Sequence, residues 1–210
     1  MYLFTRSGVL RGRPSVAMAW ATEVTAYVNA HSGQQVTLWA TWFGGPIRTV
    51  GWSTMLESYT DIESKFGALQ SDSAYSDLID KSDEFIAGSL EDNLRQVVHG
   101  TPGAEPPAVG SFAHVTTALA NVSMLPDAME WSINMAEHVE SVTGHPTMFL
   151  ADVFGTTGRV TWITVSPDLA GVDASSNAIA NNADYMKKLG KVRDLFLPGS
   201  GTRRLTNRIA

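Results

Sequence analysis

The chain has 210 residues, of which 44% are hydrophobic and 17% charged, a composition typical of one large globular domain or two small ones. A net charge of −6 argues against a nucleic-acid partner, and the lack of cysteine excludes disulfides and thiolate metal sites. No apolar run reaches the roughly 20 residues that span a bilayer, and the first ten residues lack the layout of a signal peptide. We therefore expect a cytoplasmic protein with no membrane partner.

The first half of the chain is predicted to form, in order, strand, helix, strand, strand, helix and strand. Its first helix opens at Pro14 and is closed by Gly33, with apolar residues at every fourth position between them. Two β-rich runs around a glycine-rich turn predict a hairpin. The motif Thr60-x-x-Glu63 is a capping box, which predicts the start of the second helical region. The expected strands are residues 2–10, 35–43, 48–56 and a last run that contains Leu94, Val97 and Val98.

The same series of elements returns 111 residues later. "AMAW" at 17–20 matches "AMEW" at 128–131, and "ATWFGGPIR" at 40–48 matches "ADVFGTTGR" at 151–159. After a slip of one residue, the glycine–tryptophan pair of the first hairpin matches a threonine–tryptophan pair in the second half. A common offset over nearly the whole chain indicates a tandem duplication.

Each half is predicted to be a ferredoxin-like unit, in which helices cover one face of a four-stranded antiparallel sheet. The uncovered face must be buried, and the other copy is the obvious partner. We therefore expect an α+β fold of two ferredoxin-like β-α-β-β-α-β repeats whose antiparallel sheets pack into one pseudo-dimeric α/β barrel. The repeats are residues 1–99 and 111–210, and the Pro/Gly linker 100–110 is interpreted as a tether. Both a monomer and a homo-oligomer are compatible with this arrangement.

The element order, the duplication and the stretch "GWSTMLESYTDIESKFGALQSDSAY" (51–75), where a strand tryptophan precedes a helical segment, resemble the dimeric α/β-barrel superfamily. This superfamily includes antibiotic-biosynthesis monooxygenase-like, stress-responsive A/B-barrel and NIPSNAP-like domains. The resemblance covers nearly the whole chain and implies a barrel that binds flat apolar molecules. Members include cofactor-independent oxygenases, isomerases and haem-handling proteins. We expect no cofactor, because a lone histidine such as His114 is weak evidence for a haem ligand.

Nucleotide-binding, serine-hydrolase and zinc-protease motifs are absent from the sequence. The five histidines are not spaced as a metal cluster, so no metal site is predicted.

The alternation of side chains along the strands selects a candidate ligand site. One face of the strand 35–43 is uniformly apolar and is expected to pack on helices, whereas the mixed face is expected to line the barrel. In the second copy the mixed face runs from Met148 to Phe154. The predicted ligand-binding residues are Trp39, Thr41, Phe43, Met148, Phe154 and Arg6.

Asp152 and His114 are the predicted catalytic residues. A carboxylate in an apolar strand costs several kcal/mol unless it is paired or solvated, and such a group can have a raised pKa and act as a general base. In the alternative, Asp152 lies at a strand end and is bonded to the hairpin or to an arginine. His114 and Arg6 lie on the first strands of the two copies, where they either point inward or have structural roles.

Two functions remain open at this point. In the first, the barrel binds an aromatic or polycyclic small molecule and acts as a cofactor-independent oxygenase or isomerase, with Asp152 or His114 moving a proton. In the second, large side chains fill the barrel, and the protein is a non-catalytic structural or protein-interaction module. A cavity of roughly 300 Å³ or more would favour the first.

Overall fold

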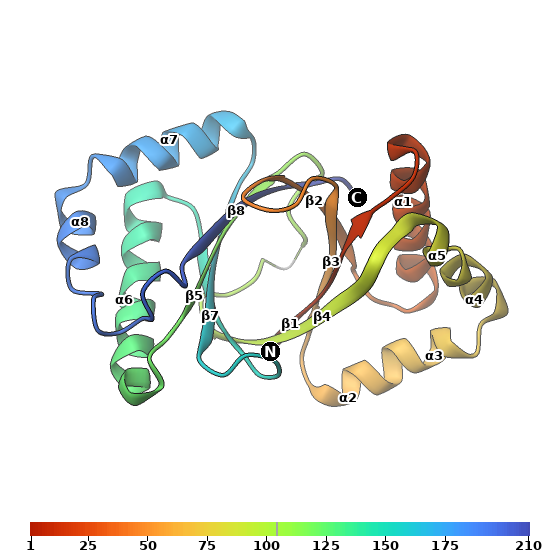
Figure 1. Cartoon of the computed structure of the whole chain (residues 1–210), viewed down its shortest axis with the longest axis horizontal. Helices are drawn as coiled ribbons and strands as arrows, with labels where there is room; N and C mark the ends of the chain where they lie inside the picture. The colour runs from red at the N-terminus through yellow and green to blue at the C-terminus, as the bar shows by residue number, and fades with distance from the viewer. Residues whose placement is uncertain (104) are drawn as a thin grey trace.

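The computed structural model describes residues 1–103 and 105–210, whose eight strands form a closed antiparallel barrel (Figure 1). Around the barrel the strand order is β1-β3-β2-β8-β5-β7-β6-β4, so each half of the chain contributes four neighbouring strands. The predicted series β-α-β-β-α-β, present twice, and the predicted barrel are confirmed. The strands are β1 (Tyr2–Leu10), β2 (Thr37–Phe43), β3 (Thr49–Leu56), β4 (Ile86–His99), β5 (Phe112–Leu119), β6 (Thr147–Asp152), β7 (Arg159–Ser166) and β8 (Thr202–Arg208).

The helices lie outside the barrel, those of the first half on one side and those of the second half on the other (Figure 1). The long helices α1 (Pro14–His31) and α6 (Leu125–Thr143) each carry a proline in the first turn. Gly144 then ends α6 in the left-handed conformation, with a φ of 70°. The second helical region of each half is divided into short helices. These are α2 (Tyr59–Asp61), a π-helical turn (Ile62–Phe66), α3 (Gly67–Gln70), α4 (Ser73–Asp80) and α5 (Ser82–Phe85), then α7 (Leu169–Ala180) and α8 (Ala183–Leu189).

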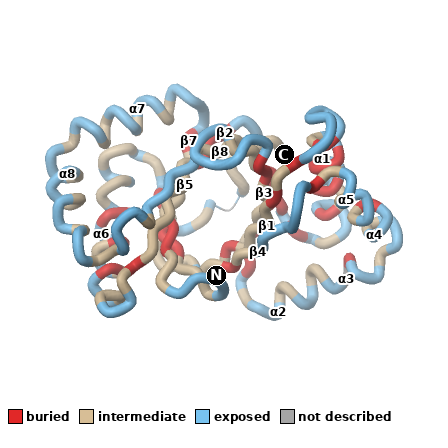
Figure 2. The backbone as a smooth tube through the Cα atoms, in the orientation of Figure 1, coloured by how far each residue is buried: buried red, intermediate tan, exposed pale blue. Residues whose placement is uncertain are grey.

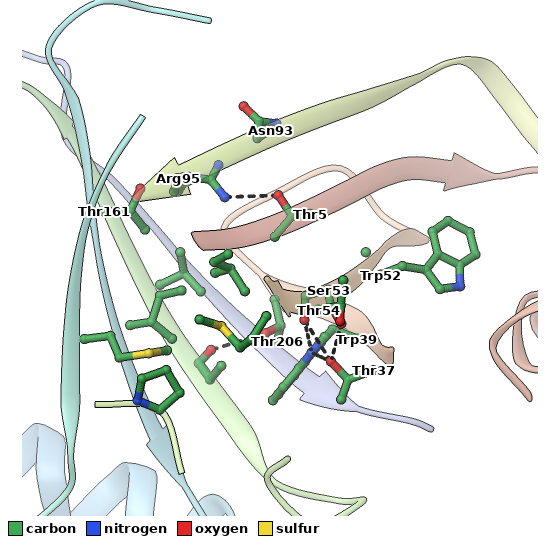
Figure 3. Close-up of a pocket in the computed structure, with 18 of the residues that line it drawn as sticks. Thr5, Thr37, Trp39, Trp52, Ser53, Thr54, Asn93, Arg95, Thr161 and Thr206 are labelled. Atoms are coloured by element: carbon green, nitrogen blue, oxygen red, sulfur yellow. Dashed lines mark hydrogen bonds between the residues drawn. The ribbon is translucent and has the colours of Figure 1, made fainter. Parts of the chain in front are cut away.

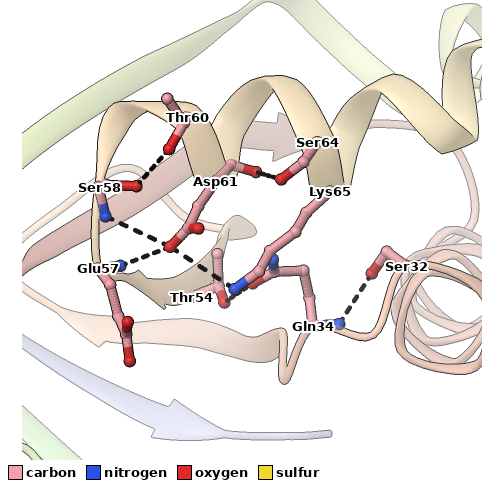
Figure 4. A network of polar contacts seen from close by, with 9 residues as sticks. All are labelled: Ser32, Gln34, Thr54, Glu57, Ser58, Thr60, Asp61, Ser64 and Lys65. Carbon is pink, nitrogen blue, oxygen red and sulfur yellow. Dashed lines mark hydrogen bonds and ion pairs between the residues drawn. The ribbon is translucent and has the colours of Figure 1, made fainter.

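The capping box at the start of α2 lies two residues earlier than predicted. Ser58 is the N-cap, and the carboxylate of Asp61 accepts hydrogen bonds from the backbone N–H groups of Glu57 and Ser58 at 2.7 and 3.3 Å (Figure 4). Thr60 lies inside the helix, with its hydroxyl 2.7 Å from that of Ser58. The motif Ser58-x-x-Asp61 has the same spacing and chemistry as Thr60-x-x-Glu63. The helix starts at the earlier motif because β3 ends at Leu56.

Buried residues lie between the sheet and the helices on both sides of the barrel (Figure 2), and most of them are apolar. The rings of Trp20 and Trp52 meet edge to face at 6.2 Å, and those of Trp131 and Trp162 meet in the same way at 6.2 Å. In each pair the helix tryptophan donates its indole N–H to a backbone carbonyl of the second helical region. Each half has therefore kept the same aromatic centre under its long helix.

The linker contributes to the wall of the barrel. The sequence analysis predicted only that it tethers the two halves. It crosses the opening of the barrel (Figure 1), and it starts at Gly100, where φ is 83°. A Cβ there would be 2.8 Å from the carbonyl oxygen of Thr147, so this close approach to β6 requires glycine. The linker residues that line the barrel cavity are Thr101, Pro102, Gly103, Glu105, Pro106 and Pro107.

Candidate functional site

The barrel encloses a cavity of about 1090 Å³ (Figure 3). Every second side chain of each strand points inward, and most of those that do are small or of medium size. The volume is well above the roughly 300 Å³ that a small-molecule site needs. The interior is therefore not filled by large side chains.

The two halves of the chain give the cavity different walls. The first half contributes more of the hydroxyl and amide groups, among them Thr5, Ser7, Thr37, Thr41, Ser53 and Asn93. The second half contributes more of the aliphatic side chains, among them Ala113, Val115, Met148, Ile163 and Val165. A molecule with an apolar body and a polar edge matches such a cavity.

Trp39 of β2 provides the large aromatic surface of the cavity. Its indole N–H donates to the hydroxyl oxygens of Thr37 and Ser53, at 2.8 and 3.1 Å (Figure 3). Those two hydroxyls are themselves 2.8 Å apart. The hydrogen bonds fix the ring and satisfy its polar atom, so the part of the ring that faces the cavity is a surface on which a flat molecule can stack.

Asp152, at the end of β6, is shared by two arginines. Its Oδ1 accepts a hydrogen bond from Nε of Arg95 at 3.1 Å, and its Oδ2 lies 3.5 Å from Nη1 of Arg159. Burial raises the pKa of Asp152, and both guanidinium groups oppose that rise. Arg95 and Arg159 line the cavity, whereas Asp152 does not. The structure therefore matches the alternative in which Asp152 is bonded to an arginine. Asp152 does not face the cavity as a general base would.

The other predicted catalytic residue, His114, lies on the outer face of β5. Its neighbours Ala113 and Val115 point into the barrel, so the alternation turns His114 outward, where it borders a small depression with Val172 of α7. Burial lowers the pKa of His114, and the positive charge of Arg203 adds to this effect. His114 does not contact the cavity.

Three of the predicted ligand-binding residues, Trp39, Thr41 and Met148, line the cavity. Phe43 does not, because the register of β2 with β8 shifts between Thr41 and Phe43. Such a bulge turns the following side chain to the other face of the sheet, and Phe43 is 66% exposed.

Phe154 and Arg6 also lie outside the cavity. Phe154 follows the end of β6 and is 65% exposed, with its ring 6.2 Å from that of Tyr59. Arg6 points outward from β1, because Thr5 and Ser7 point inward. Its guanidinium makes two hydrogen bonds of 2.7 Å to the carboxylate of Asp92.

Gln34 forms a polar corner of the cavity between α1 and β2 (Figure 4). Its side chain is buried, and its Oε1 accepts a hydrogen bond from Thr54 at 3.0 Å. No described residue accepts a hydrogen bond from its Nε2. Glu57 and Lys65 also line this corner. The ammonium group of Lys65 pairs with the carboxylate of Asp61 at 3.7 Å. An unpaired buried amide costs about 1–3 kcal/mol, so the Gln34 side chain carries an uncompensated donor at this corner of the wall.

The sequence analysis missed Arg95, Gln34 and the linker as parts of the cavity wall. A signal existed for the strand, because Glu91, Asn93 and Arg95 are polar residues at alternate positions and all three line the cavity. Gln34 and the linker lie in irregular segments, where no periodic pattern predicts which way a side chain points.

In the part of the chain that the structure describes, no group of three or more His, Cys, Asp or Glu side chains is placed to hold a metal ion. Among the described helices, none has the length and apolar character needed to cross a membrane.

The fold is shared with solved structures, although no model of a protein family and no curated protein matches the sequence. A monooxygenase-like protein of Fusobacterium nucleatum superimposes with a TM-score of 0.74 at 14% identity, over 100% of this chain and 92% of that one. An anthrone oxidase-like protein gives 0.67 at 12%, over 100% and 92%. A major regulator of staphylococcal pathogenesis gives 0.60 at 10%, over 100% of both chains. The chain thus has the dimeric α/β-barrel fold, as the duplication predicted.

Proposed function

We propose that the protein binds an aromatic or polycyclic small molecule inside the barrel. The observation that carries this proposal is the cavity of about 1090 Å³, which presents the fixed ring of Trp39 together with an aliphatic wall. A flat apolar body gains free energy there from burial and from stacking. The hollow interior argues against the alternative of a barrel plugged by its own side chains.

The reaction that we propose for this site is oxygenation or isomerisation without a bound cofactor. The fold shared with the monooxygenase-like and anthrone oxidase-like structures supports this reaction class. Neither Asp152 nor His114 lines the cavity, so the proposal assigns neither of them the proton transfer. Binding is the part of the function that the geometry itself supports.

Titration with N-phenyl-1-naphthylamine, a neutral aromatic fluorophore, tests the proposal. We expect saturable binding at one site per chain, and we expect Val115→Trp to abolish it, because the new ring would occupy the cavity that Val115 lines. Val122→Trp adds the same ring at a position that is 59% exposed and serves as the matched control. Binding that is unsaturable, or that is equal in both variants, would contradict a site inside the barrel.

A further inference from the structure

Two guanidinium groups of the cavity wall share one buried carboxylate that does not itself line the cavity. Arg95 of β4 and Arg159 of β7 both line the cavity and both pair with Asp152. The side chain of Asp152 is 1% exposed, while those of the arginines are 15% and 27% exposed. Asp152 balances the charge of one guanidinium, and Glu91, which also lines the cavity, is the other negative group near this part of the wall.

Arg95 keeps a hydrogen-bonding direction open. Its Nε donates to Asp152, and its Nη1 donates to the hydroxyl of Thr5 at 3.1 Å (Figure 3). Within the described residues, no acceptor is hydrogen-bonded to its Nη2. A guanidinium is a planar fork that suits the two oxygens of an acidic group, and Thr5 holds this fork at the surface of the cavity.

The surroundings of Arg95 favour an additional negative charge. Burial lowers the pKa of Arg95, Asp152 opposes this effect, and the nearby charge of Arg159 adds to it. Glu91, four residues earlier on β4, is an exposed residue whose charge acts on Arg95 less than that of Asp152 does. A partly desolvated cation between a second cation and one shared carboxylate is stabilised by an anionic partner.

We propose that Arg95 binds an acidic group of the ligand, so that the molecule held in the barrel is an aromatic organic acid whose rings lie against Trp39 and the aliphatic wall. This inference rests on the proposed function, because it names the ligand class of the same cavity. Thr5 and Asp152 position the guanidinium, and Arg159 adds positive charge beside it.

A matched pair of competitors tests the inference on the unaltered protein. Naphthalene-2-carboxylate and naphthalene-2-carboxamide have the same rings and differ in charge, and both can displace bound N-phenyl-1-naphthylamine. We expect the acid to displace the probe at a concentration about tenfold lower than the amide. If the amide competes as well as the acid or better, the cavity has no anion site and the inference is wrong.

A pair of variants assigns the effect to Arg95. We expect Arg95→Gln to remove the preference for the acid, measured as the ratio of the acid and amide concentrations that displace the probe from the same variant, so that a change in probe affinity cancels. Arg6→Gln removes an arginine–aspartate pair of the same barrel on its outer face, and it should leave the preference intact. An acid preference that survives Arg95→Gln would overturn the assignment. If that variant does not fold, Arg95→Lys takes its place, with a reduced preference expected because the fork is lost.

The two proposals can fail separately. If the neutral probe binds and Val115→Trp blocks it, the binding site stands and the competitors decide whether it takes acids. If the neutral probe does not bind inside the barrel, the proposed function itself is wrong, and the acid site falls with it.

Discussion

Asp152 joins the two halves of the chain, because Arg95 belongs to the last strand of the first half and Arg159 to the second half. The ion pair with Arg95 lies where β4 meets β6, opposite Asp152 in the register of the two strands. The buried carboxylate between two guanidinium groups stabilises this seam, the pairing of β4 from the first half with β6 from the second. Removal of one member leaves the others buried without compensation, which costs far more than the pair contributes.

Asp152→Asn should lower the free energy of unfolding by about 3–5 kcal/mol. Urea denaturation followed by tryptophan fluorescence measures the loss. Asp92→Asn is the matched control, since its pair with Arg6 has side chains that are 41% and 45% exposed and should contribute at most about 1 kcal/mol. Similar losses in the two variants would show that the seam does not depend on the buried carboxylate.

The short helices α4 and α8 start with the same cap built from different residues. Asp72 accepts hydrogen bonds from the backbone N–H groups of Ala74 and Tyr75 and from the hydroxyl of Tyr27 at 2.7 Å. At the equivalent position in the second half, Asn182 caps α8. One half thus uses a charged cap and the other a neutral one, which gives a natural comparison of the two chemistries.

The charged cap predicts an acid-dependent part of stability. The hydrogen bond from Tyr27, followed by those from the backbone, lowers the pKa of Asp72 below its ordinary value of 3.8. Its contribution is therefore complete above that value and is lost as the pH falls through the lowered pKa of the folded state. His31, whose ring stacks on Tyr27, lowers the pKa further.

We expect Asp72→Asn to reduce the melting temperature by a few degrees at neutral pH and to make it less sensitive to acid. Thermal unfolding between about pH 2.5 and 7 measures both effects. Asn182→Asp, the reverse change in the second half, is the control and should add acid sensitivity. Parallel pH profiles for Asp72→Asn and the unaltered protein would contradict this account of the cap.

The duplicated elements have kept their outer faces and changed their inner ones. Both copies retain a tryptophan pair under the long helix, whereas Trp39 and Thr41 on the inner face of β2 align with Leu150 and Asp152 in β6. Packing against helices restrains the outer face in each half. The inner faces together form one cavity, so each half can carry a different part of the ligand surface.

The linker gives the fused barrel a wall that two separate copies would lack. All three prolines of the linker, Pro102, Pro106 and Pro107, line the cavity and restrict the backbone around them. Replacement of all three by glycine should weaken N-phenyl-1-naphthylamine binding several-fold, because an ordered wall must then be fixed on binding. Pro198→Gly, in a loop outside the cavity, is the control. An unchanged dissociation constant would show that the linker connects the two halves without contributing to binding.

Much of this architecture is encoded locally and could be predicted from the sequence. Pro14, Gly33 and Gly144 mark helix ends through backbone conformations that they favour or tolerate. The period-two pattern of residues 35–43 separated an apolar face from a mixed one, and Trp39 and Thr41 of the mixed face line the cavity. The offset of 111 residues indicated two copies of one unit and therefore a closed barrel.

The tertiary structure alone decided which polar groups meet. Asp152 and Arg95 are 57 residues apart and become partners only through the register of β4 with β6. The bulge that turns Phe43 outward depends on how β2 pairs with β8, and the linker enters the cavity only once the barrel has closed. Local pattern fixes which face a strand buries, because alternation is a property of the strand itself. Long-range pairing fixes what that face contacts, because register and closure arise only when all the strands assemble.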